Sequence, residues 1–155
     1  MVLDTEQHPV WLATPSPHRI ERLVRPDQLA PFASLAKEIF GGNRDTAVQE
    51  LAAALAQGVD ELVGYLGFDG ETAVSVARLY VSPRSCFAGL YGGGTLEGHR
   101  GRGLYRAMVA ERVKEAMRRG ARYIRVDALP TSQPILERLG FRELTQAWPC
   151  LLPEL

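Results

Sequence analysis

The sequence contains little cysteine, no excess of charge of either sign and no long hydrophobic run. Its two cysteines, Cys86 and Cys150, lie far apart with no CxxC or Cys/His spacing around them. This scarcity argues against a disulfide framework and against a zinc site. Eighteen basic residues balance eighteen acidic ones, which is not the charge of a general nucleic-acid binder. We therefore expect no metal and no nucleic-acid partner.

No segment approaches the roughly 18 consecutive apolar residues that a membrane helix needs. The first residues, from Met1 to Glu6, contain neither a basic start nor an apolar run, so no secretory leader is expected. We therefore expect a cytoplasmic protein with no membrane partner. The length of 155 residues and the hydrophobic content of 46% predict one domain that can bury a core.

The order of apolar patterns, caps and turns predicts a mixed α+β domain. The predicted elements are strand 20–24, helix 26–40, helix 43–57 capped by Asn43, strands 61–68 and 72–81 joined by an Asp69-Gly70 turn, strand 87–96, helix 101–119, strand 123–127, helix 131–139, and last strands 141–147 and 150–152. Residues 1–18, which contain three prolines, are interpreted as an N-terminal tail or edge-lying arm, and residues 19–155 as a single domain.

Positive charge is concentrated in one region of the chain. Nine of the eighteen basic residues lie between Arg100 and Arg125, which favours an anionic ligand there. Glu111 and Glu115 alternate with these residues in the predicted helix. This spacing indicates ordinary pairing on a helix surface rather than nucleic-acid binding.

A glycine-containing loop lies at the start of this basic region. It reads His99-Arg-Gly-Arg-Gly-Leu-Tyr-Arg106 and connects a predicted strand to a predicted helix. Gly101 and Gly103 have no Cβ, so another group can approach the backbone closely. The first N–H groups of a helix have no intrahelical partners, and the helix dipole favours negative charge beside them. The loop therefore predicts a phosphate site.

Three other interpretations of the loop can be compared with its sequence. A tight turn with solvated arginines is the plainest alternative. A Rossmann fingerprint needs G-x-G-x-x-G early in a parallel unit, whereas this loop follows several predicted strands and has no third glycine. A P-loop needs Gly-Lys-Ser/Thr, which is absent from this segment.

The loop resembles the Gln/Arg-x-x-Gly-x-Gly/Ala pyrophosphate loop of the GNAT acyl-CoA N-acyltransferase superfamily. Arg100 and Gly103 match the first two marked positions, and Tyr105 stands where Gly or Ala is usual. Downstream, residues 135–141 read Ile-Leu-Glu-Arg-Leu-Gly-Phe, which resembles the end of the superfamily's last helix. The resemblance covers roughly residues 19–150 and is strongest between Leu90 and Phe141.

The resemblance implies a mixed, mostly antiparallel central sheet flanked by helices. Two central strands, here 87–96 and 123–127, would splay apart in a V that holds the pantetheine arm of acetyl-CoA, the co-substrate. The cofactor-binding residues that it implies are Thr95 and Leu96 for the pantetheine amides, and Arg100, Gly101, Arg102, Gly103, Leu104, Tyr105 and Arg106 for the pyrophosphate. The glycines at 92–94 would keep the strand surface shallow for the ligand, with a β-bulge that binds nothing as the alternative.

Catalytic residues are less clearly marked. In the superfamily a Glu or Asp near the central strands is often the base and a Tyr in the last helix is often the acid, but Leu136 stands at that Tyr position. Asp127 is the predicted base, because desolvation at the end of its strand would raise its pKa; capping a turn or pairing with an arginine is the alternative. Ser132 is the predicted acid, with Thr131, Tyr105 or a water as alternatives.

The predicted function is direct transfer of an acetyl group from acetyl-CoA to a primary amine of a small molecule or protein. The alternative is a catalytically weak CoA-binding sensor or scaffold of the same fold. The acceptor is open, and so is the oligomeric state, with a homodimer among the choices.

Overall fold

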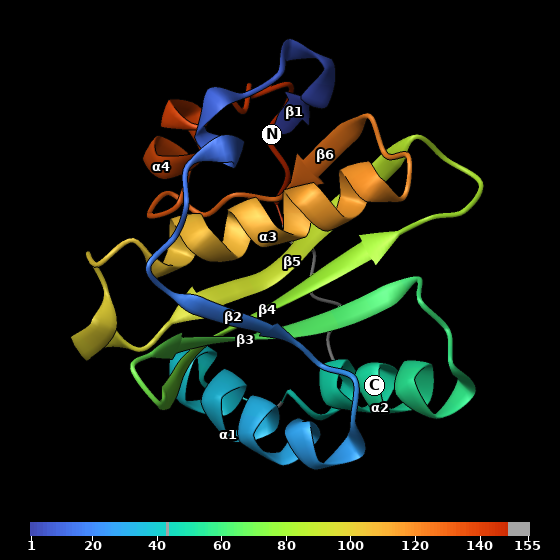
Figure 1. The fold of residues 1–155 in the computed structure, drawn as a ribbon, viewed down its shortest axis with the longest axis vertical. Helices are drawn as coiled ribbons and strands as arrows, with labels where there is room; N and C mark the ends of the chain where they lie inside the picture. Colours follow the sequence, from blue (N-terminus) through green and yellow to red (C-terminus); the bar gives the residue numbers. More distant parts are fainter. Residues whose placement is uncertain (43, 149–155) are drawn as a thin grey trace.

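The computed structural model describes residues 1–42 and 44–148 and shows one six-stranded sheet with helices on both of its faces (Figure 1). The strand order is β1-β6-β5-β4-β3-β2. Neighbouring strands are antiparallel except for β5 and β6, which are parallel. The predicted mixed, mostly antiparallel α+β fold is therefore confirmed.

The strands and helices have the following bounds. The strands are β1 (Val2–Asp4), β2 (Arg19–Arg22), β3 (Leu62–Asp69), β4 (Thr72–Val81), β5 (Phe87–Thr95) and β6 (Tyr123–Val126). The α-helices are α1 (Leu29–Phe40), α2 (Asp45–Gln57), α3 (Leu104–Arg118) and α4 (Gln133–Arg138). Short 3-10 helices are η1 (Thr5–Gln7), η2 (Val10–Ala13), η3 (Pro26–Gln28) and η4 (Glu97–His99). None of the helices in the described ranges is long and apolar enough to cross a membrane.

Each face of the sheet buries its own hydrophobic core. Side chains of successive strand residues point to opposite faces, so Tyr65 of β3 joins one core and Leu66 joins the other. The helix α3 packs on the first face with Met108 in its core, whereas α1 and α2 pack on the second face with Phe32 and Leu51. The cavity described below lies where these layers meet the end of β5.

The N-terminal segment packs onto the same sheet. Strand β1 pairs with β6 at the sheet edge, with Leu3 opposite Ile124. The Trp11 side chain of η2 is buried in the α3 core, and its Nε1 donates a hydrogen bond to the Leu139 carbonyl at 2.8 Å. Residues 1–13 therefore contribute a strand and a core aromatic ring.

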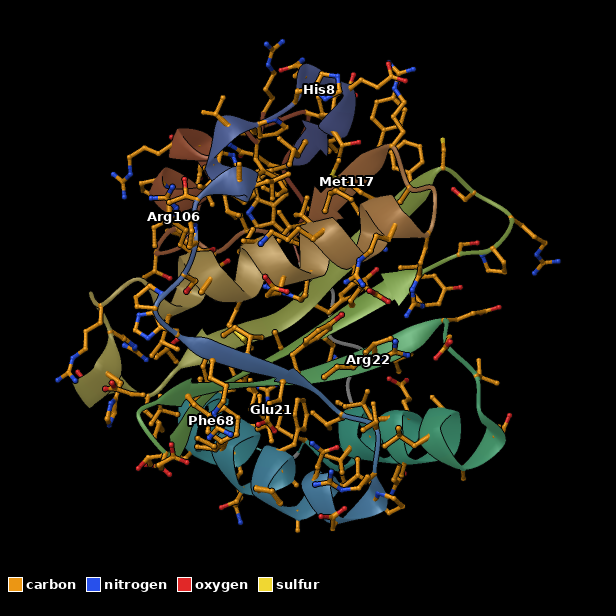
Figure 2. The ribbon with its side chains drawn as sticks, in the orientation of Figure 1. His8, Glu21, Arg22, Phe68, Arg106 and Met117 are labelled. Atoms are coloured by element: carbon orange, nitrogen blue, oxygen red, sulfur yellow. The ribbon has the colours of Figure 1, made fainter. Side chains whose placement is uncertain are left out.

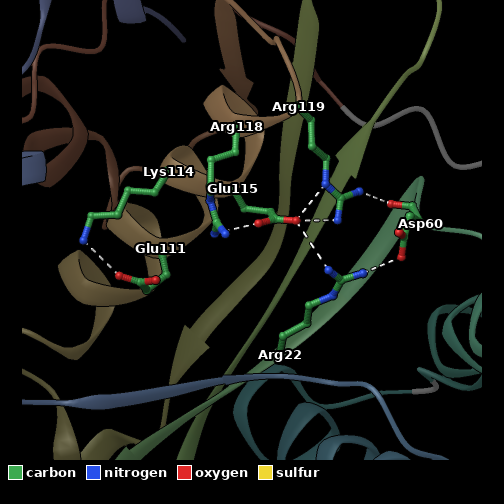
Figure 3. Close-up of polar contacts among 7 residues, drawn as sticks. All are labelled: Arg22, Asp60, Glu111, Lys114, Glu115, Arg118 and Arg119. Carbon is green, nitrogen blue, oxygen red and sulfur yellow. Dashed lines mark hydrogen bonds and ion pairs between the residues drawn. The ribbon is translucent and has the colours of Figure 1, made fainter.

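A cluster of ion pairs connects the end of α3 to β2 (Figure 3). The Glu115 carboxylate is largely buried and accepts from Arg119 at 2.5 Å, from Arg118 at 2.6 Å and from Arg22 at 3.4 Å. Arg22 and Arg119 also reach Asp60, before β3. The expected pairing of Glu115 with neighbouring arginines is confirmed, and it extends to two other segments of the chain.

Two predicted boundaries near the loop and the hairpin are wrong. The helix expected from Gly101 begins only at Leu104, because Gly101 and Gly103 have φ values of +75° and +87°, which exclude an α-helical backbone. In the hairpin, Asp69 pairs with Thr72. The two-residue turn is therefore 70–71 rather than Asp69-Gly70.

The strand expected over 141–147 is also wrong. Within the described residues this segment makes only one isolated bridge, between Arg142 and Val2. Beyond Arg142 the segment is exposed, including Leu144, so no apolar burial favours further pairing. The predicted cap Asn43 and the predicted strand 150–152 lie outside the described residues.

Candidate acyl-CoA site

A cavity of about 520 Å³ lies beside the end of β5. Three walls are formed by the end of α1, the end of β5 and the segment around the start of α4, with lining residues Ile39, Phe40, Gly93, Gly94, Thr95, Leu129, Thr131, Ser132 and Ile135. The fourth wall is the glycine loop and the first turn of α3, with lining residues His99, Arg100, Gly101, Gly103, Leu104, Tyr105 and Arg106. The structure therefore brings together most of the residues predicted to bind acetyl-CoA.

The first turn of α3 presents backbone N–H groups beside this cavity that no described residue is shown to pair with. The first intrahelical bond runs from the Ala107 N–H to the Gly103 carbonyl at 3.0 Å, so the N–H groups of the three preceding helical residues have no intrahelical partner. In the part of the chain that the structure describes, no side chain caps Gly103. Arg106 projects from this turn (Figure 2). Open N–H groups at a helix start, with an adjacent guanidinium, suit a phosphate.

The loop arginines have different roles. Arg100 lines the cavity and donates through Nε to the Thr95 carbonyl at 3.0 Å. Arg102 turns away from the cavity, donating through Nη1 to Asp69 at 2.7 Å and through Nη2 to the Gly98 carbonyl at 3.4 Å. Arg102 therefore braces the loop against the β3–β4 hairpin rather than lining the cavity.

Two polar residues that the sequence analysis missed hold the loop in place. Asp69 accepts from His99 Nδ1 at 2.7 Å as well as from Arg102, and these bonds, with His99 as the larger cause, hold the pKa of Asp69 below its usual range. His18 donates through Nε2 to the Arg102 carbonyl at 2.6 Å. No spacing in the sequence marks either residue, because their partners are 30 or more positions away.

The edge of β5 beyond β6 is available to a ligand. Pairing of β5 with β6 ends at Leu90 opposite Val126, while β5 continues to Thr95. The N–H and carbonyl of Thr95 point toward this uncovered edge, because the next N–H, that of Leu96, donates to the Val74 carbonyl of β4 at 2.9 Å. Thr95 is thus placed to pair with an extended ligand. The Leu96 N–H is already used within the sheet, and the V-shaped splay stays a prediction.

The glycines at 92–94 line the two cavities described here, but the space that a side chain would need is occupied at two of them. A Cβ on Gly94 would lie 2.6 Å from Ile39, and a Cβ on Gly93 would lie 2.9 Å from Arg112 Nη2. Other side chains therefore occupy the places where a Cβ on Gly93 or Gly94 would lie, while the backbones of both residues line the larger cavity. A β-bulge is present here, because Gly92 and Gly93 both lie opposite Ala77 of β4; the role of these glycines toward a ligand stays a prediction.

The two predicted catalytic residues line a smaller cavity of about 110 Å³ together with Tyr105. Asp127 directly follows β6 and is exposed, so it does not have the desolvated position expected of it. The Ser132 hydroxyl donates to the Leu129 carbonyl and accepts from the Leu129 N–H, both at 3.1 Å. The larger cavity shares Ser132 and Tyr105 with the smaller one, so Asp127 and Ser132 lie close to the open end of β5.

Leu136, where the resemblance would place a tyrosine, faces the core. Leu136 is fully buried and lines neither cavity. The neighbouring residues of the larger cavity are Ser132 and Ile135. Among the described residues, no group of three or more His, Cys, Asp or Glu side chains is arranged to hold a metal ion.

Residues 17–141 match the model of the acetyltransferase (GNAT) family. No curated protein sequence matches significantly.

Several solved structures share the fold at low sequence identity. The aminoglycoside N-acetyltransferase AAC(6')-Iy, in complex with the bisubstrate analogue CoA-S-monomethyl-acetylneamine, has a TM-score of 0.72 and 20% identity over 88% of this chain and 99% of its own. A Trypanosoma brucei acetyltransferase has a TM-score of 0.71 and 17% identity over 87% and 99%. A predicted acetyltransferase of Clostridium acetobutylicum, crystallised with acetyl-CoA, has a TM-score of 0.69 and 17% identity over 87% and 96%.

Proposed function

The chain belongs to the acetyltransferase (GNAT) family, and from this membership we propose that it transfers the acetyl group of acetyl-CoA directly to a primary amine of a small molecule or protein. The observation that carries the proposal is the cavity itself. It is lined by the open helix start at Gly103, by Thr95 at the end of β5 and by Ser132. These surroundings suit a pyrophosphate, an extended amide-containing arm and a thioester, respectively.

The residues present suit acetyl-CoA as the co-substrate. We assign the pyrophosphate to the N–H groups of the first turn of α3, with Arg100 and Arg106 as the adjacent positive charges. Thr95 would pair with the pantetheine arm through its backbone N–H and carbonyl. In the present structure Arg100 already donates to that carbonyl, so the arm would compete with Arg100 Nε for it.

We assign the proton transfers to the residues of the smaller cavity. Asp127, being exposed, would accept the proton of the attacking amine through a water. The leaving sulfur needs a proton or a hydrogen-bond donor, and Ser132 and Tyr105 carry the hydroxyl groups that line both cavities. Since the Ser132 hydroxyl is held by the turn at Leu129, its donation to sulfur would require that bond to break.

The acceptor is proposed to be a small-molecule amine or a protein amine. The fold is shared with an enzyme solved with an acetylneamine conjugate of CoA, which makes aminoglycosides a reasonable first member of any substrate panel. Lysine peptides and polyamines represent the other classes of amine. The cytoplasmic location remains a prediction from the sequence.

The second candidate is a CoA-binding sensor or scaffold with little turnover. It is favoured by one observation, which is that Leu136 takes the place of the superfamily's acid and is buried in the core. The two functions differ in one measurable product, free CoA.

The test combines acetyl-CoA with the full chain and a panel of amines, and follows CoA release with a thiol-reactive dye. Release that depends on one class of amine supports the transferase. Binding of acetyl-CoA by calorimetry without release across the panel supports the sensor. No binding at millimolar acetyl-CoA contradicts both.

A further inference from the structure

Arg112, in the middle of α3, is a buried cation without an anionic partner. The residue is 1% exposed, and it forms no ion pair with any residue that the structure describes. Burial lowers the pKa of Arg112 to about 10, so the guanidinium still carries its charge at neutral pH. Burying an unpaired charge is costly, and the cost must be offset by the groups around it.

Backbone carbonyls take up part of the Arg112 charge. Its Nε donates to the Met108 carbonyl at 3.0 Å, one turn earlier in α3. Its Nη1 donates to the Arg78 carbonyl at 3.1 Å and to the Tyr91 carbonyl at 3.4 Å. Arg78 and Tyr91 are the pair of residues that borders the β4–β5 bulge. Arg112 therefore fixes the bulge, where the regular ladder bonds are interrupted.

The remaining nitrogen of Arg112 is unused. In the described structure no hydrogen bond involves Nη2. This nitrogen lies 2.9 Å from the place that a Cβ on Gly93 would occupy. Arg112 and Gly93 both line the smaller cavity, together with Asp127 and Ser132. A buried cation with a free N–H group thus borders the same cavity as the proposed catalytic residues.

We propose that Arg112 is an oxyanion-stabilising residue, which presents Nη2 to the acyl carbonyl oxygen of acetyl-CoA beside Gly93. This inference rests on the proposed function. The lone pair of the acceptor nitrogen forms the C–N bond, and the carbonyl π pair moves to the oxygen, where Arg112 stabilises the negative charge. The carbonyl then re-forms, the C–S bond breaks, and its electron pair leaves on sulfur. The proton lost by nitrogen passes through Asp127 and water to sulfur, so charge and atoms balance.

The first test compares two unreactive CoA thioethers by calorimetry on the unmodified chain. S-carboxymethyl-CoA places a negative charge where the acyl group would lie, and S-acetonyl-CoA places a neutral ketone of similar shape there. A hydrogen bond from the charged Nη2 of Arg112 predicts about tenfold tighter binding of the carboxymethyl compound than of the acetonyl compound. Equal affinities would overturn the role of Arg112, whereas failure of both compounds to bind would overturn the proposed function instead.

The second test uses Arg112→Met, with Arg118→Met as the control. Arg118 lies on the same helix, is exposed, and pairs with Glu115. The Arg112→Met protein should bind both thioethers with equal affinity, and its kcat should fall by about 100-fold or more with little change in the KM for acetyl-CoA. Arg118→Met should keep the preference for S-carboxymethyl-CoA and the kcat of the unmodified chain. If Arg112 only fixes the bulge, Arg112→Met weakens both thioethers equally and keeps their ratio, which would overturn the proposal.

The Arg112→Lys protein serves as the second variant in case Arg112→Met does not fold, with circular dichroism and thermal melting to check each protein. Lysine keeps the positive charge but cannot hold the bulge carbonyls and the acyl oxygen together. We expect it to retain part of the preference for the carboxymethyl compound. A complete loss of preference in this folded variant would contradict a charge-based role.

Discussion

The Asp69 carboxylate lies 2.7 Å from Nη1 of Arg102, which joins the tip of the β3–β4 hairpin to the glycine loop. The same oxygen accepts from His99 Nδ1 at 2.7 Å. His99 and Arg102, at opposite ends of the loop's first four residues, therefore both donate to one carboxylate oxygen of Asp69. The loop's shape before α3 is set from outside, by a residue that does not line the cavity.

Replacing Asp69 by Ala should weaken acetyl-CoA binding by about tenfold. The loop would lose its two charge-assisted contacts and would have to be ordered when the pyrophosphate binds. Calorimetric titration measures this effect. Glu71→Ala is the matched control, because Glu71 lies in the same turn, is almost fully exposed and, among the described residues, pairs only with Arg19 at 3.5 Å. Equal affinities of the two variants would show that the hairpin does not position the loop.

Replacing Asp127 by Asn should lower kcat by about 100-fold and leave acetyl-CoA affinity unchanged. The amide keeps the shape of the carboxylate but cannot accept the proton of the amine. Steady-state kinetics gives kcat, and calorimetry gives the affinity. Because Asp127 is exposed, the fold should not change. An unaltered kcat would remove Asp127 from the mechanism.

Replacing Tyr65 by Phe should stabilise the folded protein by about 1 kcal/mol. The Tyr65 hydroxyl is buried and has no hydrogen-bond partner among the residues that the structure describes. An unsatisfied buried hydroxyl costs free energy, which phenylalanine removes while keeping the ring in the core. Urea unfolding at pH 7 measures the difference. Destabilisation would mean that the hydroxyl has a favourable contact in solution.

The same pair of proteins should respond differently to alkaline pH. Burial, and to a smaller extent the Glu115 charge, raise the pKa of Tyr65 from 10.0 to about 12. Between these values the unfolded chain loses a proton that the folded chain keeps, so the stability of the unmodified protein falls as pH rises from 10 toward 12. The Tyr65→Phe protein does not lose stability in this way. The stability gap between the two should therefore widen above pH 10, and a constant gap would contradict the raised pKa.

The parts of the site that could be predicted are those encoded by neighbouring residues. The loop from Arg100 to Arg106 combines glycines, arginines and a helix start within seven positions, and the structure places it against the cavity. Asp69 and His18 could not be found in this way, because they meet the loop only through the tertiary fold.

Arg112 shows a second reason why part of the site could not be predicted from the sequence. In the sequence it is one of several basic residues in a helix with interleaved acids, a pattern typical of a solvated face. The fold buries it because the bulge at Gly92 and Gly93 leaves carbonyls that it can satisfy. Element types followed from local patterns in most of the chain. The strand expected at 141–147 failed because pairing there depends on an apolar face that is absent.

We propose above that the pyrophosphate of acetyl-CoA binds at the start of α3, and the two glycines beside this helix allow a direct test. Two glycines with similar left-handed backbones flank this helix, Gly103 with φ of +87° at its start and Gly120 with φ of +84° after its end. Valine strains the backbone equally at both positions. Among the described residues, a Cβ at Gly103 would meet no protein atom closer than 3.8 Å, and a Cβ at Gly120 would meet none within 4 Å.

Calorimetric titration of acetyl-CoA into Gly103→Val and Gly120→Val therefore separates the phosphate path from backbone strain. We expect Gly120→Val to bind with the affinity of the unmodified chain. Gly103→Val should lose at least about tenfold in affinity, because its side chain would occupy the space of the phosphate. Equal affinities in the two folded variants would contradict the placement of the cofactor.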